Sequence, residues 1–245
     1  GFIVSGGSDE CVCVWDLETF SLRRKLEGHR LDVSSVCVSD DGSLIVSGSR
    51  DKTIRVWRSS SGECVCTLSD HTDSVRSVCV SHDNGFIASG SDDKTIRLWS
   101  LSSGVCVKTL EGHTSLVTSV VFSYDNSRVI SGSWDKSVRV WNVLNGVCER
   151  TLKDFPYRVN GVSLSIDTHT LAVACGNWGI DDDSKGALIV CDIESGERLH
   201  VLNGHARTVS SVSFSSDGER IVSGSDDKRV CVWVCESMSE VCVCV

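Results

Sequence analysis

The chain has 245 residues, with 24 basic against 33 acidic side chains and a formal net charge of −9. This acidic balance argues against a general nucleic-acid or anionic-membrane surface, and no stretch approaches the roughly 18 consecutive apolar residues of a membrane helix. The single proline and the lack of low-complexity tracts indicate an ordered chain. Residues 1–4 already read as a strand with no initiator Met, so we expect a fragment in which missing targeting signals carry no information.

The predicted elements are short β-strands, of which the first three in chain order lie at residues 2–5, 11–15 and 22–26. The next segment opens with Gly28-His29 and holds four β-branched runs with turn residues between them, at 33–38, 44–48, 53–57 and 64–68. This pattern is typical of a four-stranded antiparallel meander, and no window has a sustained helical period. The chain is therefore predicted to be all-β.

Tryptophan marks the repetition of this unit. Trp15, Trp57, Trp99 and Trp141 stand 42 residues apart, and Trp233 follows after intervals of 50 and 42, with Cys191 at the missing tryptophan position. A period of this size indicates one supersecondary unit copied several times. We expect one domain over 1–245, built from repeats at about 1–27, 28–69, 70–111, 112–153, 154–203 and 204–245.

Three polar residue types keep a constant distance from the repeat tryptophan: Asp stands six residues before it, Ser ten and His 28. A buried Asp needs hydrogen-bond donors, a neutral His has one donor and one acceptor, and an indole N–H only donates. These residues are therefore predicted to form one hydrogen-bonded set per sheet. The complete sets are His29/Ser47/Asp51/Trp57, His71/Ser89/Asp93/Trp99, His113/Ser131/Asp135/Trp141 and His205/Ser223/Asp227/Trp233. Ser, His and Asp also make catalytic triads, but one triad per structural repeat is not expected of an enzyme.

These residues resemble the WD-repeat β-propeller family. Gly28-His29, Gly112-His113 and Gly204-His205 match its Gly-His dipeptide, Trp15-Asp16 matches its Trp-Asp dipeptide, and residues 91–99 are close to its consensus. The resemblance implies a β-propeller of four-stranded antiparallel blades, of which six are represented, the first without its inner strand. It also implies a non-enzymatic scaffold inside the cell, cytoplasmic or nuclear, which binds partner peptides or domains on its narrow face and needs no cofactor or metal.

The repeat at 154–203 departs from the family pattern. Asp154-Phe155 stands in place of Gly-His, Val173-Ala174 in place of Ser-Gly, and eight extra residues fall in the turn around 176–186. Long inserted turns carry function more often than short ones do.

The resemblance also implies where partners bind. In such propellers the contacting side chains stand three and five residues after the Gly-His histidine and one residue before the repeat Asp. On this chain these positions include Asp32, Arg50, Arg76, Asp92, Leu116, Trp134, Arg158, Asn160 and Asp226.

Trp134 is the strongest candidate, because its counterparts in the other repeats are Ser, Arg and Asp, and aromatic residues dominate interface hot spots. Trp178, in the inserted turn, is expected to extend a contact surface formed with Leu116, Trp134 and Arg158. The alternatives are that Trp134 packs on Leu116 of its own blade and that Trp178 packs within its loop.

Other functions compete with this prediction. The arginines at the contact positions would suit a phosphopeptide, although aspartates on the same face offset their charge. A ubiquitin-ligase substrate receptor is disfavoured, since no Arg stands two residues after the Trp-Asp positions. A propeller-based enzyme would use off-register residues such as His82, His169, His200 or the run 181–183. The 14 cysteines follow the repeat, so we expect free thiols in a reducing compartment, with a metal site or disulfides as the alternatives.

Overall fold

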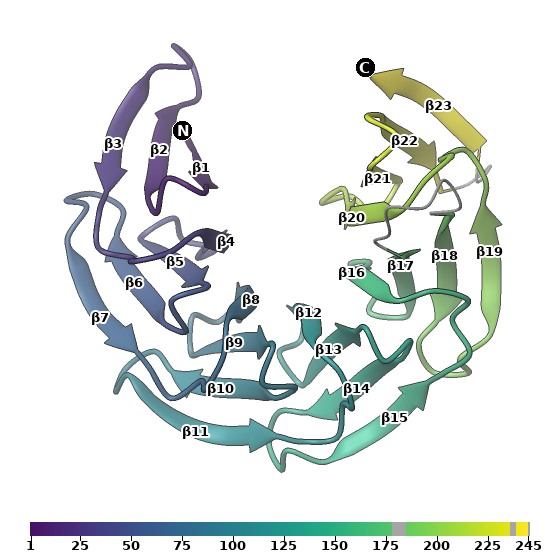
Figure 1. The fold of residues 1–245 in the computed structure, drawn as a ribbon, viewed down its shortest axis with the longest axis horizontal. Coiled ribbons are helices and arrows are strands. Elements are labelled where there is room, and N and C mark those ends of the chain that lie inside the picture. The colour runs from purple at the N-terminus through teal and green to yellow at the C-terminus, as the bar shows by residue number, and fades with distance from the viewer. Residues whose placement is uncertain (178–184, 236–238, 245) are drawn as a thin grey trace. The chain divides into compact units, whose positions relative to one another are not determined.

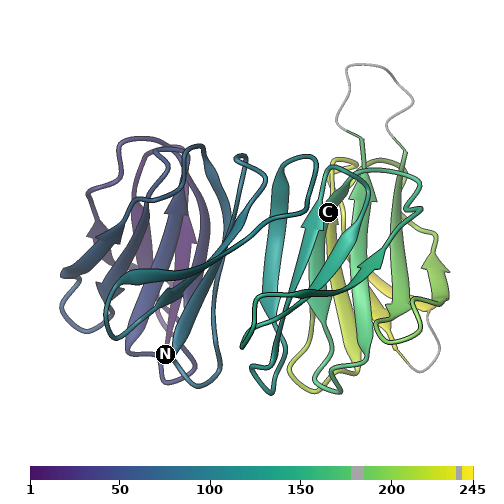
Figure 2. The same cartoon turned by 90° about the horizontal axis from the view of Figure 1, so that it is seen from below.

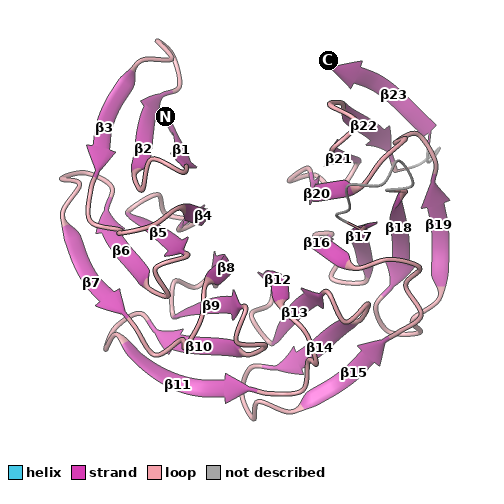
Figure 3. Ribbon diagram, viewed as in Figure 1, coloured by secondary structure: helices cyan, strands magenta, loops and turns pink. Residues whose placement is uncertain are grey.

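The structure is a computed structural model that describes residues 1–177, 185–235 and 239–244. These residues form 23 strands in six sheets and contain no helix (Figure 3). Among the described residues there is accordingly no apolar helix long enough to cross a bilayer. The sheets are the blades of a β-propeller, which confirms the predicted fold class. Contacts divide the chain into two compact units, residues 1–122 and 123–245, and each unit is described by itself.

Every sheet is an antiparallel meander whose strands pair in chain order (Figures 1 and 2). The first sheet has three strands, as predicted: β1 (Phe2–Gly6), β2 (Val12–Asp16) and β3 (Leu22–Leu26). The second has four: β4 (Val33–Val38), β5 (Leu44–Ser49), β6 (Ile54–Arg58) and β7 (Cys64–Leu68). The third has β8 (Val75–Val80), β9 (Phe86–Ser91), β10 (Ile96–Ser100) and β11 (Val105–Leu110).

The remaining sheets also have four strands each. The fourth is β12 (Val117–Phe122), β13 (Arg128–Ser133), β14 (Val138–Asn142) and β15 (Cys148–Leu152). The fifth is β16 (Val159–Leu164), β17 (Thr170–Gly176), β18 (Gly186–Asp192) and β19 (Arg198–Leu202). The sixth is β20 (Val209–Phe214), β21 (Arg220–Ser225), β22 (Val230–Val234) and β23 (Ser239–Cys244).

The core of the first unit lies between successive sheets. One apolar cluster joins Val12, Val14 and Leu26 of the first sheet to Ile45 and Trp57 of the second, and each of these side chains is buried. A second cluster joins the second and third sheets in the same way. A β-strand alternates its side chains between two faces, so a strand inside a stack of sheets buries both and reads as a nearly continuous apolar run.

Glycine allows the sheets of the first unit to approach closely. A Cβ on Gly48 would lie 2.8 Å from Val75 Cγ1, and a Cβ on Gly90 would lie 2.6 Å from Val117 Cγ1. The Ser-Gly dipeptide of the repeat therefore has two roles: the serine side chain enters the polar set, and the glycine makes room for the valine that begins the next inner strand.

A β-bulge precedes the position of the repeat tryptophan in every sheet. The register between the third and fourth strands shifts at Val56/Trp57, Leu98/Trp99, Val140/Trp141 and Val232/Trp233, with the same shift at Val14/Trp15 in the first sheet. The fifth sheet keeps this bulge at Val190/Cys191, although its tryptophan is missing. The bulge therefore belongs to the meander and does not depend on the indole.

The core of the second unit includes the degenerate repeat. Ala172, Leu188 and Val190 of the fifth sheet pack with Ile221 and Trp233 of the sixth, all buried. At the base of the inserted turn, a Cβ on Gly176 or Gly186 would lie within 2.8 Å of Thr208 atoms, so both glycines permit close contact with the start of β20.

Candidate functional site

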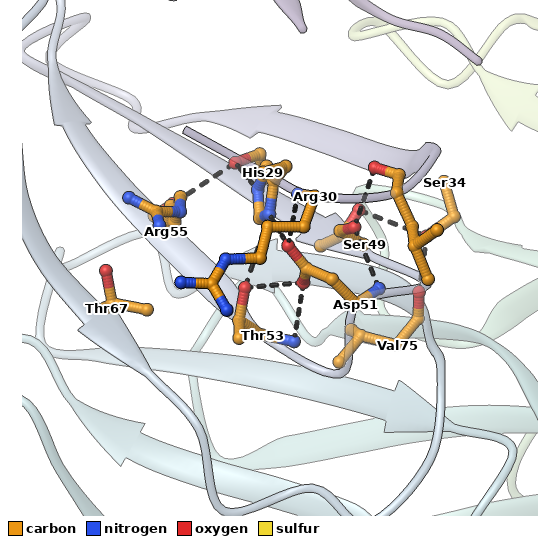
Figure 4. A network of polar contacts seen from close by, with 12 residues as sticks. His29, Arg30, Ser34, Ser49, Asp51, Thr53, Arg55, Thr67 and Val75 are labelled. Atoms are coloured by element: carbon orange, nitrogen blue, oxygen red, sulfur yellow. Dashed lines mark hydrogen bonds and ion pairs between the residues drawn. The ribbon is translucent and has the colours of Figure 1, made fainter. Parts of the chain in front are cut away.

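The polar set of the second sheet joins four segments of one blade. His29 Nδ1 lies 2.9 Å from Asp51 Oδ2, as Figure 4 shows. His29 Nε2 lies 2.8 Å from Ser47 Oγ. The Trp57 indole N–H donates to the same Ser47 Oγ over 2.8 Å. Because a carboxylate only accepts, Nδ1 carries the imidazole proton, and Nε2 accepts the serine hydroxyl.

The Asp51 carboxylate also organises the turn between β5 and β6. Its Oδ1 accepts the Thr53 hydroxyl over 2.6 Å and the Thr53 N–H over 2.9 Å, and its Oδ2 accepts the Arg30 N–H over 2.9 Å. Burial by itself would raise the pKa of Asp51, but the bonds from Thr53, Arg30 and His29 outweigh it and lower the pKa to about 2. Burial lowers the pKa of His29, and Asp51 partly offsets that effect, so the set holds a neutral imidazole beside a carboxylate.

Two further sheets repeat this geometry. His71 bonds to Asp93 over 2.7 Å and to Ser89 over 2.8 Å, and Trp99 donates to Ser89 over 2.8 Å. The corresponding distances are 3.0 Å for His205 to Asp227, 2.8 Å for His205 to Ser223 and 2.9 Å for Trp233 to Ser223. The pKa values of Asp93 and Asp227 are lowered against the effect of burial by bonds from the histidine, from the backbone and, in the third sheet, from Thr95.

The other sheets hold parts of the set. In the first, Trp15 donates to Ser5 over 2.9 Å, and in the fourth, Trp141 donates to Ser131 over 2.8 Å. Asp135 accepts the Ser137 hydroxyl over 2.6 Å. His113 is a buried residue of the first unit. In the fifth sheet Phe155, Val173 and Cys191 occupy the positions of His, Ser and Trp, and all three are buried.

Arginine also packs against the repeat tryptophans, which sequence reasoning missed. The guanidinium carbons of Arg55 and Arg139 lie 5.8 Å from the Trp57 and Trp141 ring centroids, and the same arginines donate to Cys64 Sγ and Cys148 Sγ. The available signal was an Arg two residues before the tryptophan in three repeats. In the fifth sheet this position is Ile189, and Arg198 instead lies over the Phe155 ring at 5.7 Å.

The predicted contact residues of the first unit are paired with one another. Arg50 Nη1 lies 3.1 Å from Asp32 Oδ2. Arg76 holds Asp92 with two bonds of 2.8 and 2.6 Å, which also raise the pKa of the Arg76 guanidinium. Each arginine at these positions therefore has a carboxylate of the same sheet, and the two pairs are close to electrically neutral.

Trp134 and Arg158 come together in the second unit. The Arg158 guanidinium carbon lies 4.5 Å from the centroid of the Trp134 ring, which is cation–π geometry, and both side chains are half-buried. Trp134 stands in the turn between β13 and β14, and Arg158 directly precedes β16. The two side chains thus form one surface across neighbouring sheets, here named the Trp134/Arg158 surface.

The remaining predicted contact residues differ in their surroundings. Leu116 is a half-buried residue of the first unit, and Trp178 lies outside the described residues. Asn160 donates its amide to the backbone carbonyl of Val209 over 3.0 Å, so this side chain links β16 to β20. Asp226 is exposed.

The residues named for catalysis or metal binding do not form a cluster in the described part of the chain. His82 Nδ1 bonds to Asp40 Oδ2 over 2.8 Å on the surface, and the run 181–183 lies outside the described residues. Within the described part of the chain, no three His, Cys, Asp or Glu side chains gather to hold a metal ion, and the 12 cysteines from Cys11 to Cys235 are free thiols.

Comparison with known proteins identifies the family. The sequence profile of the "WD domain, G-beta repeat" family matches residues 20–58, 62–100, 104–142 and 196–234, together more than half of the chain. The chain belongs to the WD-repeat family. The stretch between the third and fourth matches contains the repeat whose polar set is replaced.

Several curated relatives are similar over one or two repeats. WD repeat-containing protein SL1-17 of Schistosoma mansoni is 44% identical over 61 residues, which are 22% of this chain and 20% of the relative. The small ribosomal subunit protein RACK1y of Oryza sativa subsp. japonica is 57% identical over 42 residues, 17% of this chain and 12% of the relative. The human intraflagellar transport protein 122 homolog is 46% identical over 46 residues, which are 19% of this chain and 4% of the relative. The chain thus covers a fifth or less of these relatives.

Proposed function

We propose that this WD-repeat chain is a protein-interaction scaffold inside the cell and that the Trp134/Arg158 surface is its contact site for a partner protein. WD-repeat propellers are in general non-enzymatic interaction modules, and the similar proteins include a ribosomal subunit protein and an intraflagellar transport protein. The observation that carries the site is the Trp134 ring, half-buried beneath the Arg158 guanidinium in a turn.

This arrangement has the character of an interface hot spot. Tryptophan and arginine are the residue types most enriched at such positions, and stacking holds the guanidinium in place before a partner arrives. Arg158 keeps its five N–H donors at the edge of the stacked pair, where they suit carbonyl or carboxylate acceptors of the partner. The partner is therefore a protein segment that combines an apolar side chain with such acceptors.

The contact positions of the first unit support a protein partner over a phosphopeptide. Arg50 and Arg76 are already paired with Asp32 and Asp92, and a phosphate would have to displace a carboxylate from each. Displacement of such an Arg–Asp pair, above all of the bidentate Arg76–Asp92 pair, removes much of the gain that the new pair would give.

The test compares Trp134→Ala with Leu144→Ala. Leu144 is 87% exposed in the turn after β14, at the opposite end of that strand from Trp134, so its truncation removes apolar surface away from the site. The thermal unfolding midpoints of both variants and the parent chain are compared first. The three proteins are then immobilised and exposed to a cell lysate, and the captured proteins are quantified by mass spectrometry. We expect Trp134→Ala to weaken capture of a specific partner about tenfold or more, while Leu144→Ala does not.

A photo-crosslinking amino acid at position 134 then shows direct contact, with position 144 as the control. Equal capture by Trp134→Ala and the parent chain, or crosslinks only from position 144, would show that the partner binds elsewhere. A folded parent chain that captures no partner would contradict the scaffold function itself.

A further inference from the structure

A pocket of about 430 Å³ lies between the first and second sheets. Its lining consists of Phe2 of β1, Val14 of β2, Arg23 and Arg24 of β3, and Ser59 and Ser60 of the turn after β6. We name it the Arg24 pocket. Phe2 and Val14 belong to the apolar cluster that joins the two sheets, so the floor is apolar and the walls carry guanidinium and hydroxyl groups.

A second pocket has the same register in the second unit. It has a volume of about 260 Å³ and is lined by Arg128, Val140, Glu149, Arg150, Ile193 and Glu194. Counted from the repeat tryptophan, or from Cys191 in its place, each of these residues stands at the position of one that lines the Arg24 pocket: Phe2, Val14, Arg23, Arg24, Ser59 and Ser60, in that order. The propeller thus forms the same kind of pocket at two places, with different side chains.

The second pocket contains its own anions. Arg128 Nε lies 3.0 Å from a Glu149 carboxylate oxygen, and Arg128 Nη1 also bonds to Glu194. The ion pair and hydrogen bond to Glu194 raise the pKa of Arg128. The pKa of Glu194 is lowered mainly by its bond from Arg128 and also by the charge of Arg150, which stands at the position of Arg24. A carboxylate at this position is therefore within the electrostatic reach of that arginine.

The Arg24 pocket has Arg24 at the position of Arg150 but lacks those two carboxylates, since Arg23 and Ser60 occupy the positions of Glu149 and Glu194. Phe2 stands at the position of Arg128. One acid is near: Asp16 Oδ2 accepts two bonds from Arg23, one of them 2.7 Å long, and so neutralises that guanidinium. Arg24 instead donates to the Ser60 and Ser61 carbonyl oxygens over 2.7 and 2.8 Å. No carboxylate of the described residues forms an ion pair with Arg24.

The Arg24 guanidinium is therefore a fixed and uncompensated cation. Its two carbonyl bonds anchor it to the second sheet, and three of its five N–H groups remain for a ligand. A guanidinium held in place loses little freedom when it binds a carboxylate, which it matches in a bidentate manner.

From this geometry we infer that the Arg24 pocket binds the carboxylate side chain of an extended peptide segment, with an adjacent aliphatic side chain on the floor of Phe2 and Val14. The class of ligand follows from the second pocket, where the chain supplies its own glutamates, and from the apolar floor, which a bare inorganic anion would leave uncovered. The site shares no residue with the Trp134/Arg158 surface, so it does not rest on the function proposed above.

The experiment uses acetyl-Leu-Glu-Leu-amide as the probe. The Nε–Hε NMR signals of Arg23 and Arg24 are followed during titration of the folded chain, with acetyl-Leu-Gln-Leu-amide and inorganic phosphate as parallel probes. We expect saturable shifts of the Arg24 signal with half-saturation at about 1 mM or below, and at least tenfold weaker binding of the glutamine peptide and of phosphate.

Two variants sharpen the result. Ser60→Glu places a carboxylate where the second pocket has Glu194, which feels the charge of Arg150 at the position of Arg24. The new carboxylate should compete for Arg24 and weaken peptide binding at least tenfold, whereas Ser60→Gln should not. Arg30→Gln, a change at an exposed arginine that does not line the pocket, serves as a second control. Equal binding of phosphate, equal binding of the glutamine peptide, no shift at 10 mM peptide, or full binding by Ser60→Glu would each overturn the inference.

Discussion

The sheet β8–β11 and the sheet β16–β19 have the same four-stranded meander, but their polar positions differ. In the first, His71, Ser89, Asp93 and Trp99 form a continuous chain of hydrogen bonds. In the second, apolar residues or a cysteine stand at the positions of His, Ser and Trp, and those side chains are buried. Both sheets keep the strand order and the bulge at the third strand.

The comparison shows that the meander and the polar set are separate requirements. Apolar alternation and the bulge produce the sheet, whereas the set joins the entry turn, the second strand and the turn after it. A set that is wholly present or wholly replaced leaves no buried donor or acceptor without a partner, so both sheets are stable solutions. Mixed states between them should be costly, and the following changes test this.

The largest effect is expected from Asp93→Ala. The carboxylate accepts bonds from His71, from the Thr95 hydroxyl and N–H, and from the Thr72 N–H. Its removal leaves buried donors unpaired, so we expect a loss of about 3 kcal/mol or more in the free energy of unfolding. Denaturant unfolding measures this, with Asp226→Ala, a change at an exposed aspartate, as the control. A loss below about 1 kcal/mol would contradict a cooperative set.

Acid should unfold the chain through the complete sets. The folded-state pKa of Asp51 is about 2, below its usual value near 4, so its stabilising contribution is full above pH 4 and is lost as the pH falls through 2. The pKa values of Asp93 and Asp227 are lowered in the same direction and add to the loss. The lowered pKa of His29 also makes the folded chain less stable at low pH, and this loss begins as the pH falls below about 6.5. Unfolding curves between pH 7 and pH 2 measure the effect, which Asp51→Asn should reduce in the acid range.

Val173→Ser introduces one member of the set into the fifth sheet without its partners. Position 173 is fully buried, and the Phe155 and Cys191 side chains at the other positions supply no strong hydrogen-bonding group. We expect a loss of about 2 kcal/mol in stability, although serine is the residue of every complete repeat at this position. Val173→Ala is the matched control, because it removes similar volume and adds no hydroxyl. Equal stability of the two variants would show that the hydroxyl finds a partner.

Lys94→Gly should have the smallest effect. Lys94 adopts φ +71° in the turn between β9 and β10. Lys52, Lys136 and Lys228 have φ values of +71°, +65° and +68° in the corresponding turns of three other sheets. Glycine adopts this conformation without steric cost, so we expect a gain of up to about 1 kcal/mol. Lys94→Ala, which retains the strain, is the control, and thermal unfolding of both variants measures the difference.

Much of the fold could be predicted from residues at constant distance from tryptophan. The strand pattern, the three strands of the first sheet and the sheets that hold polar residues all follow from the period and from hydrogen-bonding capacity. The bulge before tryptophan could not be predicted in this way, since an extra residue present in every copy leaves the period of 42 unchanged.

The candidate sites depended more on side-chain geometry. Sequence position singled out Trp134 and Arg158, but the stacking of the guanidinium on the ring depends on rotamers and on the spacing of two sheets. The Arg24 pocket was missed because its residues are far apart in sequence and ordinary in type. The second pocket, with Glu149 and Glu194 in the same register, indicates the chemistry that the Arg24 pocket lacks.

The close approach of glycine and valine has a consequence for how such a chain grows. In the first unit, Gly48 receives Val75 and Gly90 receives Val117, so each repeat has a receiving residue on its second strand and an inserting residue on its first. One gene segment of 42 codons therefore encodes both halves of the joint between consecutive copies. Tandem duplication of that segment creates a matched interface at once, and a new blade needs no compensating mutation in its neighbours.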